Sequence, residues 1–551
     1  MHPSVADRLA RLAPDQRSAA TAPSGPVLCV APAGSGKTTT LVARVAWLVD
    51  GGIPRDAITV VAFNKRAAEE LEARLASALE PLGEVGVEGE GKGVRVRTFH
   101  ALGREMLREA GVDVAALVDR DVVLRDLFPE LPPAGRGRLD LAFSRLKLDL
   151  RVTADDVARD PEPGPLARAF VAYEGRLADE GALDFDDLVA RALRLLETDG
   201  AILSRWRARC RELLVDEAQD LDRTQLGLAL ILAAPDNRVF LVGDDDQTVY
   251  GWRLADVRRV LGLAAELPGL RRVDLVTNYR CPRPVVERAV RLVEHNTERF
   301  AKRIRAGPAA KGRLMLAPDP GDEVTRVARA MGTWPGDNTS CAVLARTNRE
   351  LLSAVVAAVQ RGLAFRAPDI PLPVEDPRFD KLLTRALRIE TGAGAQGVPP
   401  LIALAAVRSE VAALPPPDED TPAPAELATA LIGWAAPYPS IAALGDAIRA
   451  WRTRVQELRR DDAPLALATA HGTKGLEWDH VVVLADGFPG RRSISDATEP
   501  ERALEEERRL AYVAWTRARR SLTLLYDPAT PSPFLHEAFD DAELGVPPHK
   551  A

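Results

Sequence analysis

The stretch that decides the fold is Ala31-Pro32-Ala33-Gly34-Ser35-Gly36-Lys37-Thr38. It follows the apolar run Val27-Leu28-Cys29-Val30 and opens a helical pattern through Leu41, Val45 and Leu48. In a strand–loop–helix context, backbone N–H groups cradle phosphates, the lysine adds a positive charge and the threonine hydroxyl can bind Mg²⁺. The alternative is an ordinary glycine turn before a helix, since the strict pattern begins with Gly rather than Ala31. We interpret the stretch as a phosphate-binding loop.

A second element fits the same chemistry. Leu213-Leu214-Val215-Asp216-Glu217 is an apolar run that ends in two carboxylates, about 180 residues after the loop. Asp216 is placed to hold the Mg²⁺ shell, and Glu217 to orient or deprotonate the attacking water. Two acidic residues after a strand can also be a solvated turn, but the upstream loop favours the functional interpretation.

Composition sets the broad class. A chain of 551 residues exceeds one ordinary core, so we expect roughly three to five domains or subdomains. No run of about eighteen uncharged apolar residues predicts a membrane span, and the first residues lack a signal-peptide pattern. The four cysteines lie far apart, with no metal or disulfide spacing. We expect a cytoplasmic protein. The net charge of −7 does not favour nucleic-acid binding, although net charge does not decide what lines one groove.

Short apolar runs alternate with helical patterns, which predicts an α/β protein built on parallel sheets. Helical periodicity replaces the strand signals between about residues 101 and 197, and a second break runs from about 369 to 462. Within that break, the proline-rich residues 414–422 are predicted to form a loop or linker. The runs predicted as buried strands are residues 27–30, 58–63, 213–215, 239–242 and 481–484.

Several further segments, in order along the chain, resemble the motifs of superfamily 1 helicases of the UvrD/Rep/PcrA type. Asp216-Glu217-Ala218-Gln219-Asp220 continues the carboxylate element as in this family, and residues 242–253, Val-Gly-Asp-Asp-Asp-Gln-Thr-Val-Tyr-Gly-Trp-Arg, resemble motif III nearly residue for residue. Leu254 then stands where the family usually has glycine. The other matching segments are residues 12–16 (Q motif), 63–71 (Ia), 98–100 (Ib), 278–280 (IV), 471–478 (V) and 505–518 (VI).

The resemblance implies two RecA-like P-loop domains with parallel sheets, the first with a helical insertion and the second with a small one. The implied first domain (1A) comprises residues 1–100 and 195–270, with insertion 1B at 101–194. The implied second domain (2A) comprises 271–368 and 463–535, and residues 536–551 form a C-terminal tail. Residues 369–462 are too few for the usual 2B subdomain, so we predict a reduced one.

The resemblance also implies the roles in an ATP site. Arg280 and Arg517 are the expected arginine fingers, which compensate the charge of the transferred phosphoryl group. The alternative for each is a surface salt bridge. Gln247 is the expected γ-phosphate sensor that couples hydrolysis to the DNA groove, and Glu477 the expected ribose contact.

Adenine recognition is expected to involve Gln16, which reads the base edge, and Tyr279, which stacks on it. Family members commonly carry arginine where this chain has Thr39, so Tyr279 would stack alone. We therefore predict looser nucleotide discrimination than in typical relatives.

For the DNA track, the aromatic residues Tyr250, Trp252 and Phe63 are expected to stack unpaired bases, which requires little sequence preference. Core packing would be the default for a Tyr-Gly-Trp turn without the resemblance. The expected supplementary DNA contacts are Arg253, Thr98, His100 and His471.

The resulting expectation is an ATP-dependent single-stranded DNA translocase or helicase that uses ATP and Mg²⁺. By resemblance it moves 3′ to 5′, acts in DNA repair, recombination or replication, and binds single-stranded DNA and duplex junctions. One alternative is a motor subunit that requires a nuclease or other repair partner, and another is a DNA-binding ATP switch without unwinding. The small 2B-like segment predicts weak unwinding by the isolated chain.

Overall fold

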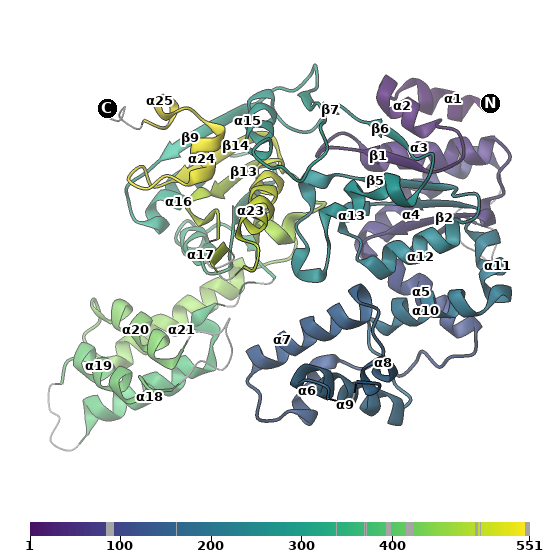
Figure 1. Ribbon diagram of the computed structural model, residues 1–551. Coiled ribbons are helices and arrows are strands. Elements are labelled where there is room, and N and C mark those ends of the chain that lie inside the picture. Colours follow the sequence, from purple (N-terminus) through teal and green to yellow (C-terminus); the bar gives the residue numbers. More distant parts are fainter. Residues whose placement is uncertain are drawn as a thin grey trace, which may run out of the picture.

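The computed structural model describes residues 1–83, 93–160, 162–337, 339–368, 370, 372–392, 398–414, 423–490, 494–495 and 497–545. Two lobes lie side by side, each built on a parallel sheet, and a helical module extends below each lobe (Figure 1). The predicted fold class is confirmed. Apart from Leu414, the proline-rich loop predicted at 414–422 lies outside the described residues.

The first lobe contains a six-stranded sheet in the order β3-β2-β4-β5-β1-β6. Its central strands are short, apolar and fully buried, as parallel strands covered by helices on both faces must be. The apolar runs predicted in this lobe are strands to within a residue or two. The strands are β1 (Val27–Val30), β2 (Ile58–Ala62), β3 (Arg95–Thr98), β4 (Glu212–Val215), β5 (Val239–Gly243) and β6 (Arg271–Asp274).

Strand β6 corrects one predicted boundary. The predicted second domain begins at residue 271, but β6 pairs in parallel with β1 at the edge of the first sheet. Its sequence, Arg271-Arg272-Val273-Asp274, carries no apolar run because its first two residues are exposed at the sheet edge. The chain crosses to the second lobe only after this strand.

Helices cover both faces of the first sheet. One face carries α1 (Pro3–Ala10), α2 (Pro14–Ala20), α3 (Lys37–Asp50) and α4 (Lys65–Leu79). The other face carries α5 (Phe99–Glu109), α10 (Asp187–Thr198), α11 (Gly200–Arg209), α12 (Arg223–Ala233) and α13 (Val257–Leu261).

The helical insertion of the first lobe is smaller than predicted. Helices α5 and α10 were assigned to it, yet they share one apolar core with the sheet. A separate core, which includes Phe143, Phe170 and Tyr173, holds the protruding part together. That part comprises α6 (Arg120–Leu127), α7 (Pro133–Ser144), a π-helical turn (Arg145–Asp149), α8 (Ala154–Ala158) and α9 (Pro165–Asp179).

The second lobe contains another six-stranded parallel sheet, in the order β11-β12-β10-β13-β14-β9. Its strands are β9 (Arg313–Pro318), β10 (Cys341–Ala345), β11 (Phe365–Arg366), β12 (Leu465–Thr469), β13 (Trp478–Leu484) and β14 (Ala518–Tyr526). Two short strands, β7 (Thr277–Asn278) and β8 (Arg305–Ala306), pair with each other beside it.

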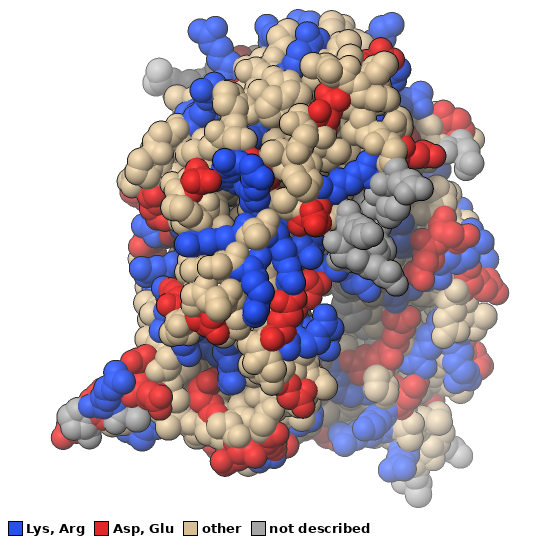
Figure 2. Space-filling view, turned by 90° about the vertical axis from the view of Figure 1, so that its right-hand side faces the viewer, with Lys and Arg blue, Asp and Glu red and all other residues tan. Residues whose placement is uncertain are grey.

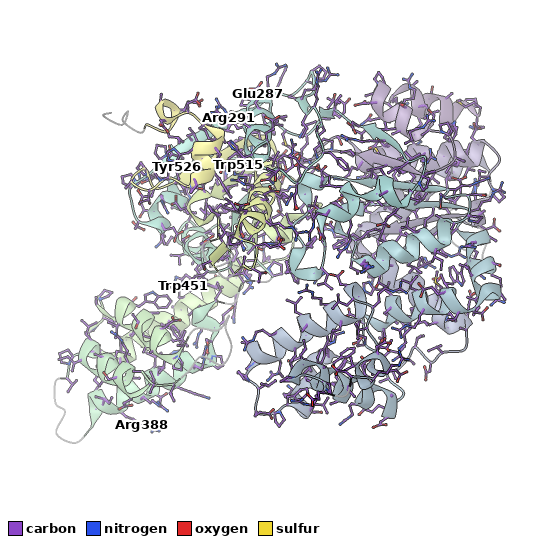
Figure 3. All side chains as sticks on the ribbon, in the orientation of Figure 1. Glu287, Arg291, Arg388, Trp451, Trp515 and Tyr526 are labelled. Carbon is purple, nitrogen blue, oxygen red and sulfur yellow. The ribbon has the colours of Figure 1, made fainter. Side chains whose placement is uncertain are left out.

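Helices α15 (Arg283–Val293) and α23 (Pro500–Trp515) cover one face of this sheet, and α16 (Glu323–Met331) and α17 (Leu351–Gln360) the other. Trp515 of α23 and Tyr526 of β14 lie inside the lobe (Figure 3). The small helical module consists of α18 (Pro377–Thr391), α19 (Pro400–Glu410), α20 (Pro424–Ala435) and α21 (Ile441–Leu458).

Part of the predicted C-terminal tail is packed. Helices α24 (Pro533–Ala538) and α25 (Asp541–Leu544) follow the last strand, and Phe539 and Leu544 are buried against the second lobe. These apolar side chains dock because the lobe leaves an apolar face for them. The residues after Gly545 lie outside the described residues.

Surface charge is mixed. On the side of the first lobe that faces away from the second, Lys and Arg side chains gather in the middle, with Asp and Glu around them (Figure 2). The net charge of −7 therefore coexists with local positive regions. Among the described residues, no helix has the length and apolar character needed to cross a bilayer.

Candidate functional site: a cavity between the two lobes

The loop between β1 and α3 requires its glycines. Gly34 and Gly36 have φ angles of 68° and 86°, in the left-handed region that glycine adopts without strain. A Cβ atom on Gly34 would lie 2.7 Å from the Cβ of Arg280, and one on Gly36 would lie 2.5 Å from Nε2 of Gln16. The loop therefore turns tightly at the N-terminus of α3, where backbone N–H groups can face an anion.

Gln16 stabilises this loop through hydrogen bonds of its side-chain amide. Its Nε2 donates to the carbonyl of Ser35 at 2.7 Å, and its Oε1 accepts from the backbone N–H of Ala13 at 3.0 Å. Ala31 is fully buried and continues the β1 ladder through a bond from its N–H to the Gly243 carbonyl. In this arrangement Gln16 and Ala31 support the loop and do not line the cavity, and the predicted adenine contact of Gln16 stays a prediction.

The carboxylates after β4 face the loop. Glu217 Oε1 lies 3.7 Å from Lys37 Nζ, and Glu217 has a left-handed φ of 52° that aims its side chain toward the loop. Burial and the adjacent Glu217 raise the pKa of Asp216 to about 7. Although burial opposes ionisation, Lys37 and Lys474 lower the pKa of Glu217 to about 2. Glu217 is thus held as an anion beside the loop lysine.

The residues predicted to hold Mg²⁺ offer suitable donors. Thr38 provides a hydroxyl and Asp216 a carboxylate, and both line the same cavity. Magnesium prefers oxygen ligands and is commonly held by one or two carboxylates together with substrate phosphates. Among the described residues, no group of three or more His, Cys, Asp or Glu side chains is arranged around a metal position. Such a cage is not needed for a site of this kind.

A cavity of about 680 Å³ brings most of the predicted nucleotide site together, with walls from both lobes. Thr39, Phe63 and Tyr250 also line it. The predicted nucleotide-site residues that line it are Pro32, Ala33, Gly34, Ser35, Gly36, Lys37, Thr38, Asp216, Glu217, Gln247, Tyr279, Arg280, Glu477 and Arg517.

The two arginines of the second lobe reach the cavity in different ways. Arg280 forms a 2.5 Å ion pair between its Nε and Glu477 Oε2. Arg517 is buried and donates from Nη2 to Oε1 of Gln247 at 3.1 Å and from Nε to the Val513 carbonyl at 2.7 Å. Burial and the nearby Arg280 lower the pKa of Arg517 to about 10, so it remains protonated. Gln247 and Arg517 thus join the lobes beside the loop.

Lys474 is a cavity residue to which the sequence analysis gave no role. Its Nζ forms an ion pair with Asp220 and donates to the backbone carbonyl of Gln247 at 2.8 Å. It also lies 4.0 Å from Glu217 Oε2. Its position in motif V, close to the predicted DNA contact His471, was the feature of the sequence that could have indicated a functional role. Lys474 links the second lobe to both the carboxylate element and motif III.

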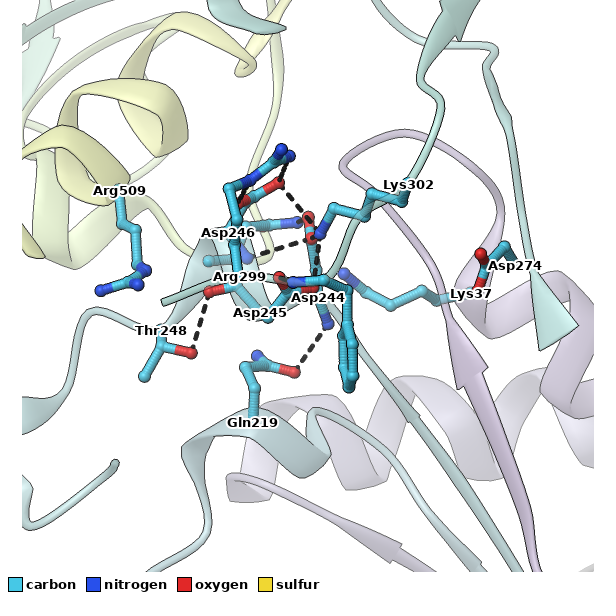
Figure 4. A network of polar contacts seen from close by, with 12 residues as sticks. Lys37, Gln219, Asp244, Asp245, Asp246, Thr248, Asp274, Arg299, Lys302 and Arg509 are labelled. Carbon is cyan, nitrogen blue, oxygen red and sulfur yellow. Dashed lines mark hydrogen bonds and ion pairs between the residues drawn. The ribbon is translucent and has the colours of Figure 1, made fainter. Parts of the chain in front are cut away.

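A buried network of charges holds motif III in place (Figure 4). Lys302 Nζ lies 2.8, 2.5 and 2.9 Å from carboxylate oxygens of Asp244, Asp245 and Asp246. Arg299 adds a bidentate pair with Asp246 at 2.9 and 2.8 Å. Asp244 also accepts from Nε2 of Gln247 at 2.6 Å, which turns the Oε1 atom of Gln247 toward Arg517. The network therefore fixes the amide of Gln247.

The predicted DNA-stacking residues form a continuous row. Phe63 stacks on Tyr250 with ring centroids 5.1 Å apart and an interplanar angle of 17°. Trp252, half exposed at 52%, lies edge-on to Tyr250 at 6.1 Å. Arg253 covers the Trp252 ring at 4.5 Å. Three aromatic rings and one cation thus lie together, and two of the rings, Phe63 and Tyr250, stack on each other and line the cavity.

Phe185 extends the aromatic set and was missed by the sequence analysis. It is 58% exposed and stacks on His100 at 4.0 Å. Burial lowers the pKa of His100 to about 4, so the ring is neutral at physiological pH. The signal available in the sequence was a phenylalanine among acidic residues, Asp184-Phe185-Asp186-Asp187. In the structure, ion pairs of Asp184 and Asp186 with Arg120 anchor that turn.

The remaining predicted DNA contacts lie close to these aromatic residues. Thr98 caps α5, its Oγ1 accepting from the N–H of Ala101 at 3.2 Å. The backbone carbonyl of His471 accepts from the Tyr250 hydroxyl at 3.5 Å. Burial, together with Arg346, lowers the pKa of His471 to about 4. The DNA-binding roles stay predictions.

Comparison with known families agrees with this geometry. Residues 12–128 and 139–268 match the UvrD/REP helicase N-terminal domain, and residues 451–528 match the UvrD-like helicase C-terminal domain. The chain belongs to the UvrD-like superfamily 1 helicase family. The resemblance inferred from the motifs is confirmed, and the two matches include the phosphate-binding loop, motif III and motif VI.

Three relatives illustrate the similarity. ATP-dependent DNA helicase Rep of Salmonella typhimurium is 30% identical over 336 residues, 58% of this chain and 48% of that protein. DNA helicase II of Escherichia coli K12 is 30% identical over 373 residues, 64% and 50% respectively. ATP-dependent DNA helicase PcrA of Staphylococcus epidermidis is 30% identical over 303 residues, 52% and 40%. The chain spans about half the length of the curated relatives that it matches or somewhat less.

Proposed function

We propose that this chain hydrolyses ATP and uses the energy to move along single-stranded DNA. The observation that carries the proposal is the cavity whose walls come from both lobes, with Lys37 on one side and Arg280 and Arg517 on the other. A phosphoryl-transfer site needs charge on both sides of the γ-phosphate, whereas a simple binding module does not. The relatives named above are described as DNA helicases, two of them as ATP-dependent.

In the proposed site, the loop N–H groups and Lys37 bind the phosphates, and Tyr279, 50% exposed at the cavity, stacks on the base. Glu477 contacts the ribose. Thr38 and Asp216 would hold Mg²⁺, which when bound neutralises charge on the phosphate oxygens. Glu217 orients the attacking water or deprotonates it.

Charge compensation in the transition state falls to Arg280 and Arg517. Arginine fingers contribute about 10³–10⁵ in rate in related reactions. Gln247 senses the γ-phosphate, because its amide lies between Arg517 and Asp244 and any change at the phosphate alters this pairing. Closing of the lobes around ATP, and reopening after hydrolysis, is a rigid-body switch of the kind that ligands drive.

On the DNA side, we propose that bases stack on Phe63, Tyr250, Trp252 and Phe185. Each such stack contributes about 1–3 kcal/mol with little sequence preference, which suits a motor. Arg253, Thr98, His100 and His471 would add contacts to the backbone and bases. Movement 3′ to 5′, duplex junctions as substrates, and a place in repair, recombination or replication are further parts of the proposal, drawn from the family.

Two other functions would give different experimental results. A motor subunit that requires a nuclease or other repair partner would hydrolyse ATP on DNA but unwind weakly alone, and the small module α18–α21 favours this outcome. A DNA-binding switch would bind ATP and DNA yet displace nothing. We expect weak unwinding, and efficient separation of a long 3′-tailed duplex by the purified chain would refute that expectation.

The test is steady-state ATP hydrolysis with and without single-stranded DNA or RNA, for the wild type and Lys37→Ala. We expect strong stimulation by single-stranded DNA and loss of turnover in the variant. Lys381→Ala, at an exposed lysine of α18, is the matched control and should leave turnover unchanged. Displacement of a triplex strand then separates a motor from a switch. A wild-type chain without DNA-stimulated hydrolysis would contradict the proposal.

A further inference from the structure

The aromatic turn Tyr250–Trp252 is tied to the second lobe by one carboxylate. The backbone N–H of Gly251 donates to Glu506 Oε1 at 3.0 Å. Gly251 lies between the two aromatic residues, and Glu506 lies in the second turn of α23. A hydrogen bond to a charged acceptor is stronger than a neutral one, so this contact is a specific link between lobes.

The fit at this link is tight. A Cβ atom on Gly251 would lie 2.6 and 2.7 Å from the two carboxylate oxygens of Glu506. The φ of Gly251 is not in the left-handed region, so its backbone conformation does not require glycine. The close approach of Glu506 is therefore what excludes a side chain at this position.

Neighbouring residues hold α23 against the same region. Arg502 Nη2 pairs with Asp256 Oδ1 at 2.6 Å, just beyond the aromatic turn. Glu505 Oε1 accepts from the N–H and hydroxyl of Thr297, at 2.7 Å each, next to the segment whose Lys302 binds motif III. The first turns of α23 thus face the DNA-stacking row from the second lobe.

The other end of α23 leads into the nucleotide cavity. The helix ends at Trp515, and Arg517 follows within two residues and bonds Gln247. From Glu506 to Arg517 the separation along a rigid helix is on the order of 15 Å. A helix moves as a unit, so a displacement of Arg517 is transmitted to Glu506.

We propose that Glu506 is a positioning residue that couples the state of the nucleotide to the aromatic turn. When the lobes close on ATP, α23 carries Arg517 toward the phosphates and pulls Gly251 with it, which shifts Tyr250 and Trp252 relative to a stacked base. The inference rests on the proposed function. It adds a mechanical link that bypasses Gln247 and runs along the helix.

The test compares Glu506→Ala, Glu506→Gln and Gly251→Ala with wild type. Glu506→Ala removes the acceptor, Glu506→Gln keeps a carbonyl oxygen that can accept, and Gly251→Ala displaces the carboxylate by its new methyl group. Glu501→Ala, at an exposed glutamate in the first turn of the same helix, is the matched control. Thermal unfolding followed by circular dichroism identifies any variant that fails to fold.

The decisive quantity is the number of nucleotides moved per ATP, from stopped-flow translocation on end-labelled DNA together with hydrolysis rates. For Glu506→Ala and Gly251→Ala we expect DNA-stimulated hydrolysis within about threefold of wild type and nucleotides per ATP reduced about tenfold, because closure of the lobes no longer pulls on the aromatic turn. Glu506→Gln should stay within about threefold. The fluorescence of 2-aminopurine in bound DNA should respond to a non-hydrolysable ATP analogue in wild type and not in Glu506→Ala.

The two substitutions act on one contact, so the double variant Gly251→Ala/Glu506→Ala should be no worse than either single variant. Wild-type coupling in Glu506→Ala, or strictly additive losses in the double variant, would overturn the inference. If Glu506→Ala does not fold, Gly251→Ala decides the matter by the same criterion. Wild-type protein without DNA-stimulated hydrolysis would instead refute the proposed function itself.

Discussion

Replacing Lys302 with methionine removes an ammonium group that lies within 2.9 Å of all three carboxylates Asp244, Asp245 and Asp246. The Lys302 side chain and the three carboxylates have no exposed surface. Arg299 would still pair with Asp246, but Asp244 and Asp245 would lose their ammonium partner. Removing one partner of a buried ion pair costs about 3–5 kcal/mol, because a charge remains without compensation.

We therefore expect Lys302→Met to lower the free energy of unfolding of the first lobe by about 3–5 kcal/mol. At roughly 2–4 °C per kcal/mol for a domain of this size, the Tm falls by about 6–20 °C. Differential scanning calorimetry on the full chain measures this. Lys311→Met, at an exposed lysine, is the matched control and should change the Tm by no more than about 2 °C.

The pH dependence gives an independent check. Although burial opposes ionisation, Lys302 and Arg299 lower the pKa of Asp246 to about 2, below its unfolded value of about 3.9. Its stabilising contribution is thus present above about pH 4 and lost as the pH falls toward 2. In Lys302→Met this contribution of Asp246 is reduced, so the penalty relative to wild type is largest above about pH 4 and shrinks as the pH falls toward 2. A Tm difference from wild type that is equal at pH 7 and pH 3, or that at pH 7 is no larger than that of Lys311→Met, would refute the reasoning.

Three further predictions concern the cavity and motif III. Arg517→Ala should lower DNA-stimulated ATP turnover by about 10³-fold or more while single-stranded DNA affinity stays within about threefold, and near-normal turnover would contradict the finger role. Leu254 has a left-handed φ of 66°, a conformation that is strained for residues other than glycine. In denaturant titrations, Leu254→Val should therefore lose about 1–2 kcal/mol of stability, whereas Leu254→Gly should stay within about 1 kcal/mol of wild type. Equal effects of the two substitutions would disprove strain at this position. GTP and CTP should replace ATP, at least poorly, in hydrolysis assays, because Thr39 offers no second stacking surface, and strict ATP dependence would show the opposite.

Much of the fold was predictable because the decisive elements carry local signals. The runs at β1, β2, β4 and β5 are apolar throughout, since both faces of the parallel sheet are covered. Strand β6 escaped prediction because an edge strand exposes Arg271 and Arg272 and so lacks that signal. Helices α5 and α10 were assigned to the insertion because helical periodicity does not reveal which partner a helix packs against.

The site shows the same division between local and long-range information. The loop at Gly34 and Gly36 can be recognised from its local sequence. Lys302 cannot, because it lies more than fifty residues from the carboxylates that it neutralises. Its burial depends on the path of the chain after α15, which no local pattern encodes. The left-handed φ of Leu254 explains why glycine suits this position, since glycine adopts that conformation without strain and leucine does so at a cost, and nothing in the structure explains the leucine.

The ion pairs within the cavity suggest how nucleotide binding would be coupled to lobe closure. Lys37 pairs with Glu217, and Arg280 pairs with Glu477, so two of the three cations proposed at the phosphates lie beside a carboxylate to which we assign another role. A triphosphate that attracts Lys37 and Arg280 releases Glu217 toward the water and Glu477 toward the ribose. Nucleotide binding would thus replace two ion pairs, each formed within one lobe, by contacts from both lobes to the same triphosphate. Binding energy is thereby directed into closing the lobes, because the new partners of the cations are shared across the cavity.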